Sequence, residues 1–161
     1  MQEINIKMDN EAVVDCGVDK RQINTTNNIL PDVYDLGGKT ILVVEDNSIN
    51  QMVIKMITKK WLNTTVIYAN NGQEGIEVIK TNKIDIVLMD LQMPVMDGYD
   101  ATQAIRSGAA GLENVAIPII AVTADVMEVT KKQIEQIGMN NYISKPIKKQ
   151  ELYEMVKELV F

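Results

Sequence analysis

The feature that most constrains the fold is an alternation of short apolar runs with segments of helical periodicity. TILVVED (40–46), IDIVLMD (84–90) and IPIIAVTA (117–124) have the length of strands and are apolar at almost every position. TTVIYA (64–69) and NYIS (141–144) are shorter runs rich in β-forming residues. Strands that are apolar on both faces are typical of parallel sheets covered by helices on both sides.

Helical segments follow each of these runs. Apolar residues recur at i, i+3, i+4, i+7 and i+8 in two segments, which are Ile49, Met52, Val53, Met56 and Ile57, and Leu152, Met155, Val156, Leu159 and Val160. Further helices are expected in NGQEGIEVIK, after Asp97-Gly98, and over Val126 to Ile137. The five β–α units predict an α/β fold with a doubly wound, five-stranded parallel sheet.

Residues 1–37 differ from the rest and predict a flexible acidic tail or linker, followed by one folded domain over residues 38–161. The segment is rich in Asn, Asp and Thr and has no sustained period. Its seven acidic residues against Lys7, Lys20 and Arg21 account for about -4 of the net charge of -6.

Composition excludes several classes of function. The chain has no histidine, which excludes the usual serine triads, Cys-His nucleophiles and most zinc sites. The net charge of -6 disfavours direct binding of nucleic acid. We find no signal peptide and no apolar run near the roughly 20 residues of a membrane span, so no membrane insertion is expected. Cys16 is the single cysteine, which suits a cytoplasmic location.

Polar residues stand where the expected strands end. Glu45 and Asp46 end the first, Asp90 the third and Thr123 the fourth, while the fifth leads to Lys145. Open α/β sheets form their sites at the carboxyl ends of the strands. Three carboxylates in one cleft repel one another, and an all-oxygen set suits Mg²⁺. Asp90 could then act as a nucleophile that forms an aspartyl-phosphate, with Lys145 and Thr123 binding the phosphoryl oxygens.

Each residue also has a purely structural interpretation. Glu-Asp-Asn after a strand is a common turn and helix cap, Thr favours strands, and Lys145 could be solvated. The functional interpretation depends on all of them occurring at one edge of one sheet.

Residues 39–161 resemble the receiver domain of two-component response regulators. The motifs are ILVVEDNSINQMV, DIVLMDLQMPVMDGYDATQAIR, IIAVTA and NNYISKPI, in that order. The EDNxxNQ opening is most similar to receivers attached to hybrid sensor kinases. The resemblance implies a flavodoxin-like sheet with strand order 2-1-3-4-5.

The resemblance also implies roles for single residues. Asp90 would accept a phosphoryl group from a phosphohistidine on a histidine kinase or histidine phosphotransfer protein. Asp46, Asp90 and the main-chain carbonyl of Gln92 would bind Mg²⁺, and Glu45 would act through a metal-bound water.

Thr123 and Tyr142 would form a switch pair, and Lys145 would match the family's lysine, whose bond to the following Pro146 is often cis. A downstream protein would bind the face formed by the fourth helix, fifth strand and fifth helix. The resemblance therefore implies a signalling phosphoacceptor and not an enzyme. Such a chain would catalyse only its own phosphorylation and slow dephosphorylation.

Two other functions remain as alternatives. A phosphatase that works through an aspartyl-phosphate would need a second Asp in a D-x-D core, where this chain has Gln92. A flavin-binding module would need a phosphate loop after the first strand, where EDNSIN is acidic. If the chain is a receiver domain, it is either a stand-alone regulator or the receiver of a hybrid kinase.

Overall fold

The computed structural model describes residues 33–161 and contains one parallel sheet of five strands. The strand order β2-β1-β3-β4-β5 confirms the predicted fold class and topology. The strands are β1 (Asp35–Val44), β2 (Leu62–Ala69), β3 (Ile86–Asp90), β4 (Ile119–Thr123) and β5 (Asn141–Ser144). The α-helices are α1 (Ser48–Thr58), α2 (Gly72–Thr81), α3 (Gly98–Arg106), α4 (Glu128–Gln136) and α5 (Lys149–Val160).

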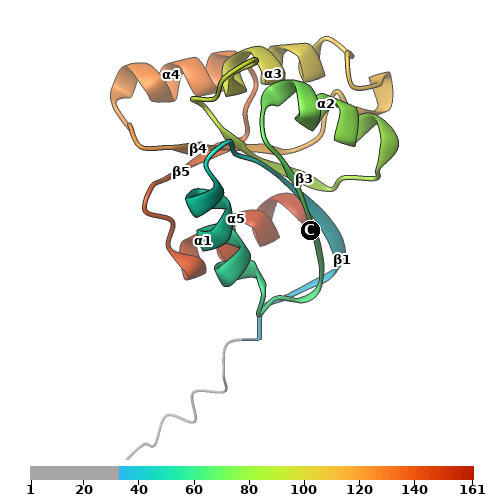
Figure 1. The fold of residues 1–161 in the computed structure, drawn as a ribbon, viewed down its shortest axis with the longest axis vertical. Helices are drawn as coiled ribbons and strands as arrows, with labels where there is room; N and C mark the ends of the chain where they lie inside the picture. The colour runs from blue at the N-terminus through green and yellow to red at the C-terminus, as the bar shows by residue number, and fades with distance from the viewer. Residues whose placement is uncertain (1–32) are drawn as a thin grey trace, which may run out of the picture. The chain divides into compact units, whose positions relative to one another are not determined.

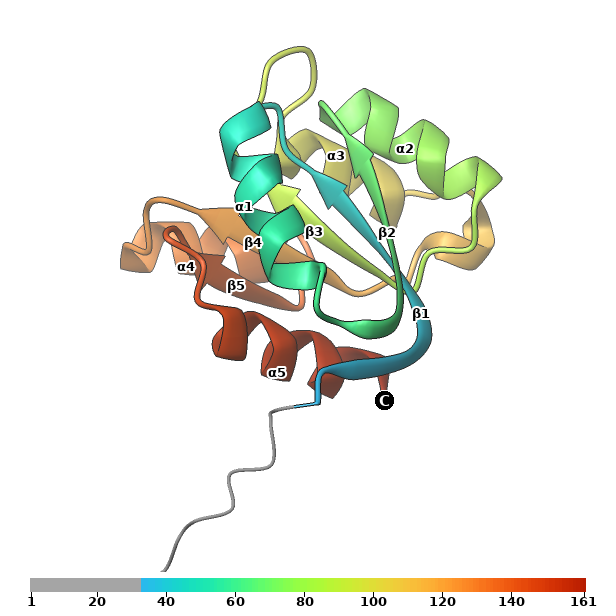
Figure 2. The ribbon, with the colours of Figure 1, turned by 60° about the horizontal axis from the view of Figure 1, so that its bottom comes forward.

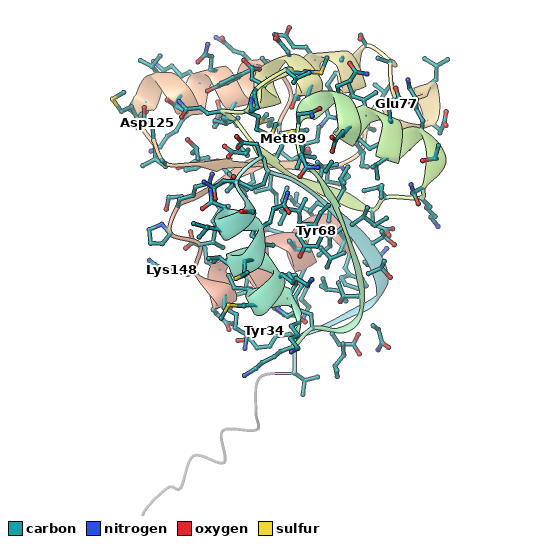
Figure 3. The ribbon with its side chains drawn as sticks, viewed as in Figure 1. Tyr34, Tyr68, Glu77, Met89, Asp125 and Lys148 are labelled. Carbon is teal, nitrogen blue, oxygen red and sulfur yellow. The ribbon has the colours of Figure 1, made fainter. Side chains whose placement is uncertain are left out.

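Helices cover both faces of the sheet, with α1 and α5 on one side and α2, α3 and α4 on the other (Figures 1 and 2). Ile54 of α1 and Leu152 of α5 belong to one apolar cluster, and Ile79 of α2 and Ile105 of α3 belong to the other. Every residue of β3 and β4 is buried, which explains why these strands are apolar at nearly all positions. Met89 lies in this central region (Figure 3).

The register brings the carboxyl ends of the strands together. Val44 pairs with Met89, Asp90 with Val122, and Thr123 with Ser144. Side chains that follow β1, β3, β4 and β5 therefore meet at one edge of the sheet, as the strand-end argument predicted.

The first strand begins earlier than expected. Residues 33–37 were assigned to the tail, but β1 starts at Asp35 and Leu36 is fully buried. The Tyr153 hydroxyl donates to the Asp35 carbonyl at 3.0 Å and accepts from the Asp35 N–H at 3.1 Å. Gly37 and Gly38, both at positive φ, form an irregularity in the ladder that lets the strand resume at Lys39. The part of the tail prediction that concerns residues 1–32 lies outside the described residues.

Most of the apolar stripe of α1 faces the solvent, and within it only Ile57 packs against the core. Ile49, Met52 and Met56 are 71%, 62% and 68% exposed, whereas Ile54 and Thr58 form the buried face. Periodicity located the helix correctly but did not identify which face the sheet covers. In α5, by contrast, the predicted stripe includes the buried Leu152 and Val156. Among the helices of residues 33–161, none has the length and apolar character to cross a bilayer.

Substituting Tyr153→Phe should test the attachment of the early part of β1. The change removes both hydrogen bonds to Asp35, so we expect the free energy of unfolding in urea to fall by about 1–2 kcal/mol. Tyr99→Phe is the matched control, because no hydrogen bond involves the Tyr99 hydroxyl in the described part of the chain, and it should change stability little. Equal stabilities for the two variants would contradict the anchoring role of Tyr153.

Candidate functional site

The polar strand ends form a cleft of about 210 Å³ at the carboxyl edge of the sheet. Its lining residues are Glu45, Asp46, Asn47, Asn50, Asp90, Gln92, Thr123, Ala124 and Lys145. Three carboxylates and one ammonium therefore share a small space, and their geometry decides which chemistry is available.

Glu45 is the most deeply buried of the three carboxylates, with 1% of its surface exposed. Its Oε1 accepts hydrogen bonds from the Asn50 side chain at 2.9 Å and the Asn47 N–H at 3.2 Å. Burial raises the pKa of Glu45, and the nearby Asp90 charge adds to this, while the hydrogen bond from Asn50 and the ammonium of Lys145 oppose it. The Asn47 side chain also caps α1 by accepting from the N–H groups of Ile49 and Asn50, so the start of α1 is part of the site.

Asp90 ends β3 and is 6% exposed. Its Oδ1 accepts the N–H of Gln92 at 3.1 Å, and its Oδ2 lies 2.6 Å from Lys145 Nζ. Each carboxylate oxygen thus has a fixed partner, which orients the group within the cleft.

Lys145 connects two carboxylates with one ammonium group. Its Nζ lies 2.6 Å from Asp90 Oδ2 and 2.9 Å from Glu45 Oε2. The contact with Asp90 has the geometry of a hydrogen bond, whereas Glu45 Oε2 has only the ion pair. Burial by itself would lower the pKa of Lys145, but the two carboxylates raise it, so the side chain stays charged.

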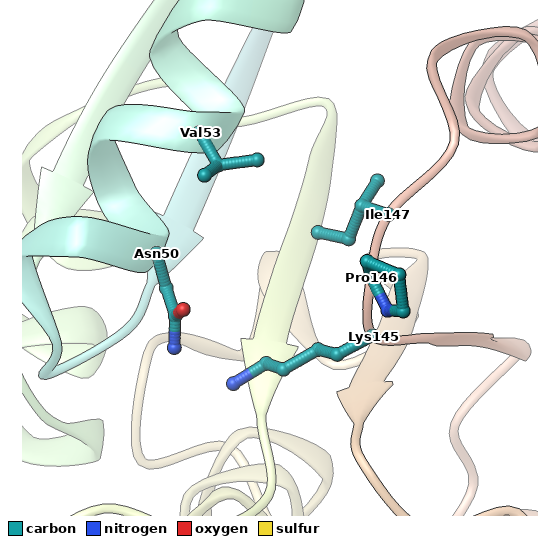
Figure 4. A pocket seen from close by; sticks show the side chains of 5 residues that line it. All are labelled: Asn50, Val53, Lys145, Pro146 and Ile147. Carbon is teal, nitrogen blue, oxygen red and sulfur yellow. The ribbon is translucent and has the colours of Figure 1, made fainter.

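The backbone of Lys145 is attached to the end of β4. The Lys145 N–H donates to the Thr123 carbonyl at 2.8 Å, and the bond to Pro146 is cis, as expected. In Figure 4 the side chains of Lys145 and Asn50 reach toward the same region from opposite sides.

The acidic residues are suitably arranged for a divalent cation. Oxygens of Glu45, Asp46 and Asp90 all lie within 4.8 Å of one another. Asp46 is exposed and has no hydrogen bond or ion pair within residues 33–161, and the Gln92 carbonyl accepts none there. A single lysine only partly compensates three carboxylates, and an all-oxygen donor set fits a hard cation such as Mg²⁺.

The two expected switch residues differ in position. Thr123 lines the cleft, but its hydroxyl donates to the Asp125 carbonyl at 2.9 Å and accepts from the Asp125 N–H at 3.0 Å. Tyr142 lies on β5, outside the cleft lining, with Lys131 Nζ 5.7 Å from the centre of its ring.

The structure therefore brings together most of the residues singled out from the sequence. Those in the cleft are Glu45, Asp46, Asp90, Gln92, Thr123 and Lys145. Sequence reasoning gave no role to Asn50, although it is the second Asn of the EDNxxNQ motif. Asn50 follows Asn47, the residue that caps α1, by three positions, and this spacing directs its amide toward Glu45. The spacing is visible in the sequence and could have identified Asn50.

Comparisons with known proteins agree with this geometry. A family model described as the response regulator receiver domain matches residues 41–157. The sensor histidine kinase GacS of Pseudomonas protegens is 35% identical over 116 residues, which are 72% of this chain and 12% of that protein. The chain spans 7% to 18% of the length of the curated kinases compared with it.

Two solved structures are similarly informative. A sensor kinase receiver domain from Pseudomonas aeruginosa PAO1, with magnesium coordinated in its active-site cleft, is 35% identical with a TM-score of 0.69. The alignment covers 76% of this chain and 98% of that one. The receiver domain of the response regulator Ssk1 of Saccharomyces cerevisiae, crystallised with the phosphotransfer protein Ypd1, is 29% identical with a TM-score of 0.69, over 77% and 90% of the two chains.

The strand order, the acidic cleft with its bridging lysine, and the match over residues 41–157 lead to one conclusion: this chain belongs to the response regulator receiver domain family.

Proposed function

We propose that this chain is a phosphoacceptor switch that takes a phosphoryl group from a partner phosphohistidine onto Asp90, with Mg²⁺ bound. The observation that carries the proposal is the position of Asp90, which lines the cleft together with the exposed carboxylate of Asp46 and the bridging Lys145. The receiver crystallised with magnesium and the receiver crystallised with a phosphotransfer protein support the cofactor and the class of partner.

In the reaction, an Asp90 oxygen attacks the phosphorus, the P–N bond to the donor imidazole breaks, and its electron pair leaves with the ring. The Asp90 carboxylate becomes an acyl phosphate and loses its own charge. Lys145, which pairs with that carboxylate beforehand, can then face the phosphoryl oxygens. Asp46, Asp90 and the Gln92 carbonyl would hold Mg²⁺, with Glu45 acting through water, and the ion would neutralise charge on the transferred group.

The donor is proposed to approach across α1. A hollow of about 350 Å³, lined by Asn50, Val53, Lys145, Pro146 and Ile147, adjoins the cleft (Figure 4). The exposed apolar residues of α1 extend from it, and such a patch on a small domain favours protein association. A phosphotransfer protein that covers this patch would exclude water from its phosphohistidine.

The output is proposed to pass through Thr123 and Tyr142 to the face of α4, β5 and α5, where a downstream protein would bind. For Thr123 to contact the phosphoryl group, its hydroxyl must leave the Asp125 backbone. That movement would shift the start of α4 and change the space available to Tyr142.

The phosphatase alternative is less well supported, because Gln92 offers no acid or base two positions after Asp90.

For the domain limits, we propose a receiver domain over residues 38–161, extended at its start by the ordered residues 33–37. A cytoplasmic location also remains a proposal, supported by the relationship to histidine kinases that carry receivers.

The chemistry is tested by substituting Asp90→Asn. With Mg²⁺ and acetyl phosphate, the native chain should gain one phosphoryl group by intact-mass spectrometry, and the variant none, because an amide is not a nucleophile here. Asp100→Asn, an exposed residue on α3 outside the cleft, is the control and should be labelled like the native chain. Labelling of the Asp90 variant would overturn the assignment.

The metal site is tested by comparing Asp46→Ala with Glu45→Ala. We expect Mg²⁺ affinity, measured by titration calorimetry, to fall more in the Asp46 variant, because Asp46 would bind the ion directly and Glu45 through water. The Asp100→Asn variant serves again as the control. The opposite order would mean that the inner and outer ligands are exchanged.

The output route is tested with beryllofluoride, which stands in for the phosphoryl group. Amide NMR shifts should change at Asp90, at Thr123 and also around Tyr142 and α4. In a Thr123→Ala variant, the changes around Tyr142 should shrink while those at Asp90 persist. Changes confined to the cleft in the native chain would exclude this route.

A further inference from the structure

A second hollow lies on the same face of the sheet, between α1 and the edge strand β2. It measures about 370 Å³ and is lined by Lys55, Thr58, Lys59, Trp61, Thr64, Val66 and Tyr68. A smaller hollow of about 260 Å³, toward the start of α1, shares Lys55 and Tyr68 with it. The two form one groove along α1, and Tyr68 is labelled beside this helix in Figure 3.

Two buried polar atoms of the groove residues have no hydrogen-bond partner within the described part of the chain. They are Nε1 of Trp61, a side chain only 5% exposed, and the hydroxyl oxygen of Tyr68. The Thr58 hydroxyl lies close enough to the Tyr68 hydroxyl to lower its pKa, but it donates to the Ile54 carbonyl at 2.9 Å and forms no hydrogen bond of good geometry with Tyr68. Leaving a buried donor unpaired is energetically costly, so such atoms are rare in folded proteins. Both residues line the groove, so a small shift of either side chain would bring its donor to an acceptor bound there.

The charge of this region has the opposite sign to that of the whole chain. Residues 47–73 contain Lys55, Lys59 and Lys60 and no acidic residue, although the net charge of the chain is -6. Within residues 33–161, Lys55 and Lys59 form no ion pair. Two uncompensated ammonium groups therefore flank a hollow that contains two unpaired donors.

We propose that the α1–β2 groove binds an organic anion, with its carboxylate or phosphate group between Lys55 and Lys59 and its apolar body against Trp61 and Val66. The free polar groups are two ammonium groups, an indole N–H and a hydroxyl that can donate, and together they favour a ligand that carries acceptors and negative charge. The volume lies in the range of small-molecule sites, which combine apolar walls with a few polar groups.

The groove is separate from the acidic cleft, because the lining residues of the two do not overlap. It is nevertheless connected to the cleft through α1, whose Asn50 holds Glu45 at one end and whose Lys55 and Thr58 line the groove at the other. The proposal does not rest on phosphorylation of Asp90. Burial raises the pKa of Tyr68 against a smaller lowering by Thr58, so its hydroxyl remains protonated and able to donate at neutral pH.

Trp61 provides a direct readout, because it is the only tryptophan in the chain and gives a single indole N–H signal in NMR spectra. Titration with 1-naphthoate should shift this signal saturably, and the uncharged 1-naphthalenemethanol should not. A titration with inorganic phosphate shows whether negative charge without an apolar body is enough for binding. We expect it to shift the Trp61 signal much less than 1-naphthoate does. The absence of a saturable shift with 1-naphthoate at millimolar concentration would overturn the proposal.

The two lysines are tested with a matched control. The double substitution Lys55→Gln and Lys59→Gln should weaken 1-naphthoate binding about tenfold, which two partly screened ion pairs can supply. Lys60→Gln changes the net charge of the same segment but does not line the groove, and binding should be unchanged. Equal weakening by Lys60→Gln would mean that the probe responds to general surface charge and would contradict the site.

Tyr68→Phe separates a ligand-binding role from a structural one. Removing an unpaired hydroxyl should leave the unfolding midpoint in urea unchanged or raised, and should weaken 1-naphthoate binding. A loss of stability as large as that of Tyr153→Phe would show that the Tyr68 hydroxyl already has a partner, and the groove would not then need a ligand.

Discussion

The ion pairs of Lys145 with Glu45 and Asp90 are the interaction on which the site depends. Two largely buried carboxylates this close repel each other, and burial alone raises the pKa of Glu45. A single ammonium, at 2.6 Å from Asp90 and 2.9 Å from Glu45, holds both carboxylates in place. The arrangement leaves Asp46 exposed, so the charge balance remains negative on the open side of the cleft. The site is therefore preorganised for further positive charge and not saturated by its own lysine.

The parallel sheet makes this arrangement possible. Because β1, β3, β4 and β5 run in the same direction, Glu45, Asp90, Thr123 and Lys145 reach one edge from distant parts of the sequence. The helix that starts at this edge contributes as well, since Asn47 caps α1 and Asn50 holds Glu45. The apolar surface of α1 and the basic groove behind it are thus attached to the same element as the acidic cleft.

Much of this could be predicted from the sequence, and the exceptions have physical causes. The central strands were located correctly, because strands buried on both faces are apolar throughout and leave little ambiguity. The start of β1 was missed because Gly37-Gly38 resembles a linker, whereas Leu36 and Tyr153 anchor the residues before it through contacts distant in sequence. The stripe on α1 was identified, but periodicity cannot reveal whether the sheet or the solvent faces it. The residue types that line the cleft could be predicted from the sequence. The hydrogen bond from Asn50 to Glu45 could not, because it depends on where the fold places the two side chains.

The bridging lysine also has a consequence for the order in which the molecule matures during translation. Asp90 and Lys145 are separated by 55 positions, and β5 must pair with β4 before the ammonium reaches the carboxylates. A nascent chain that extends only through β4 already carries Glu45, Asp46 and Asp90 but lacks the cation that holds two of them together. The cleft in the form described above should therefore arise late, once β5 has been synthesised and has joined the sheet.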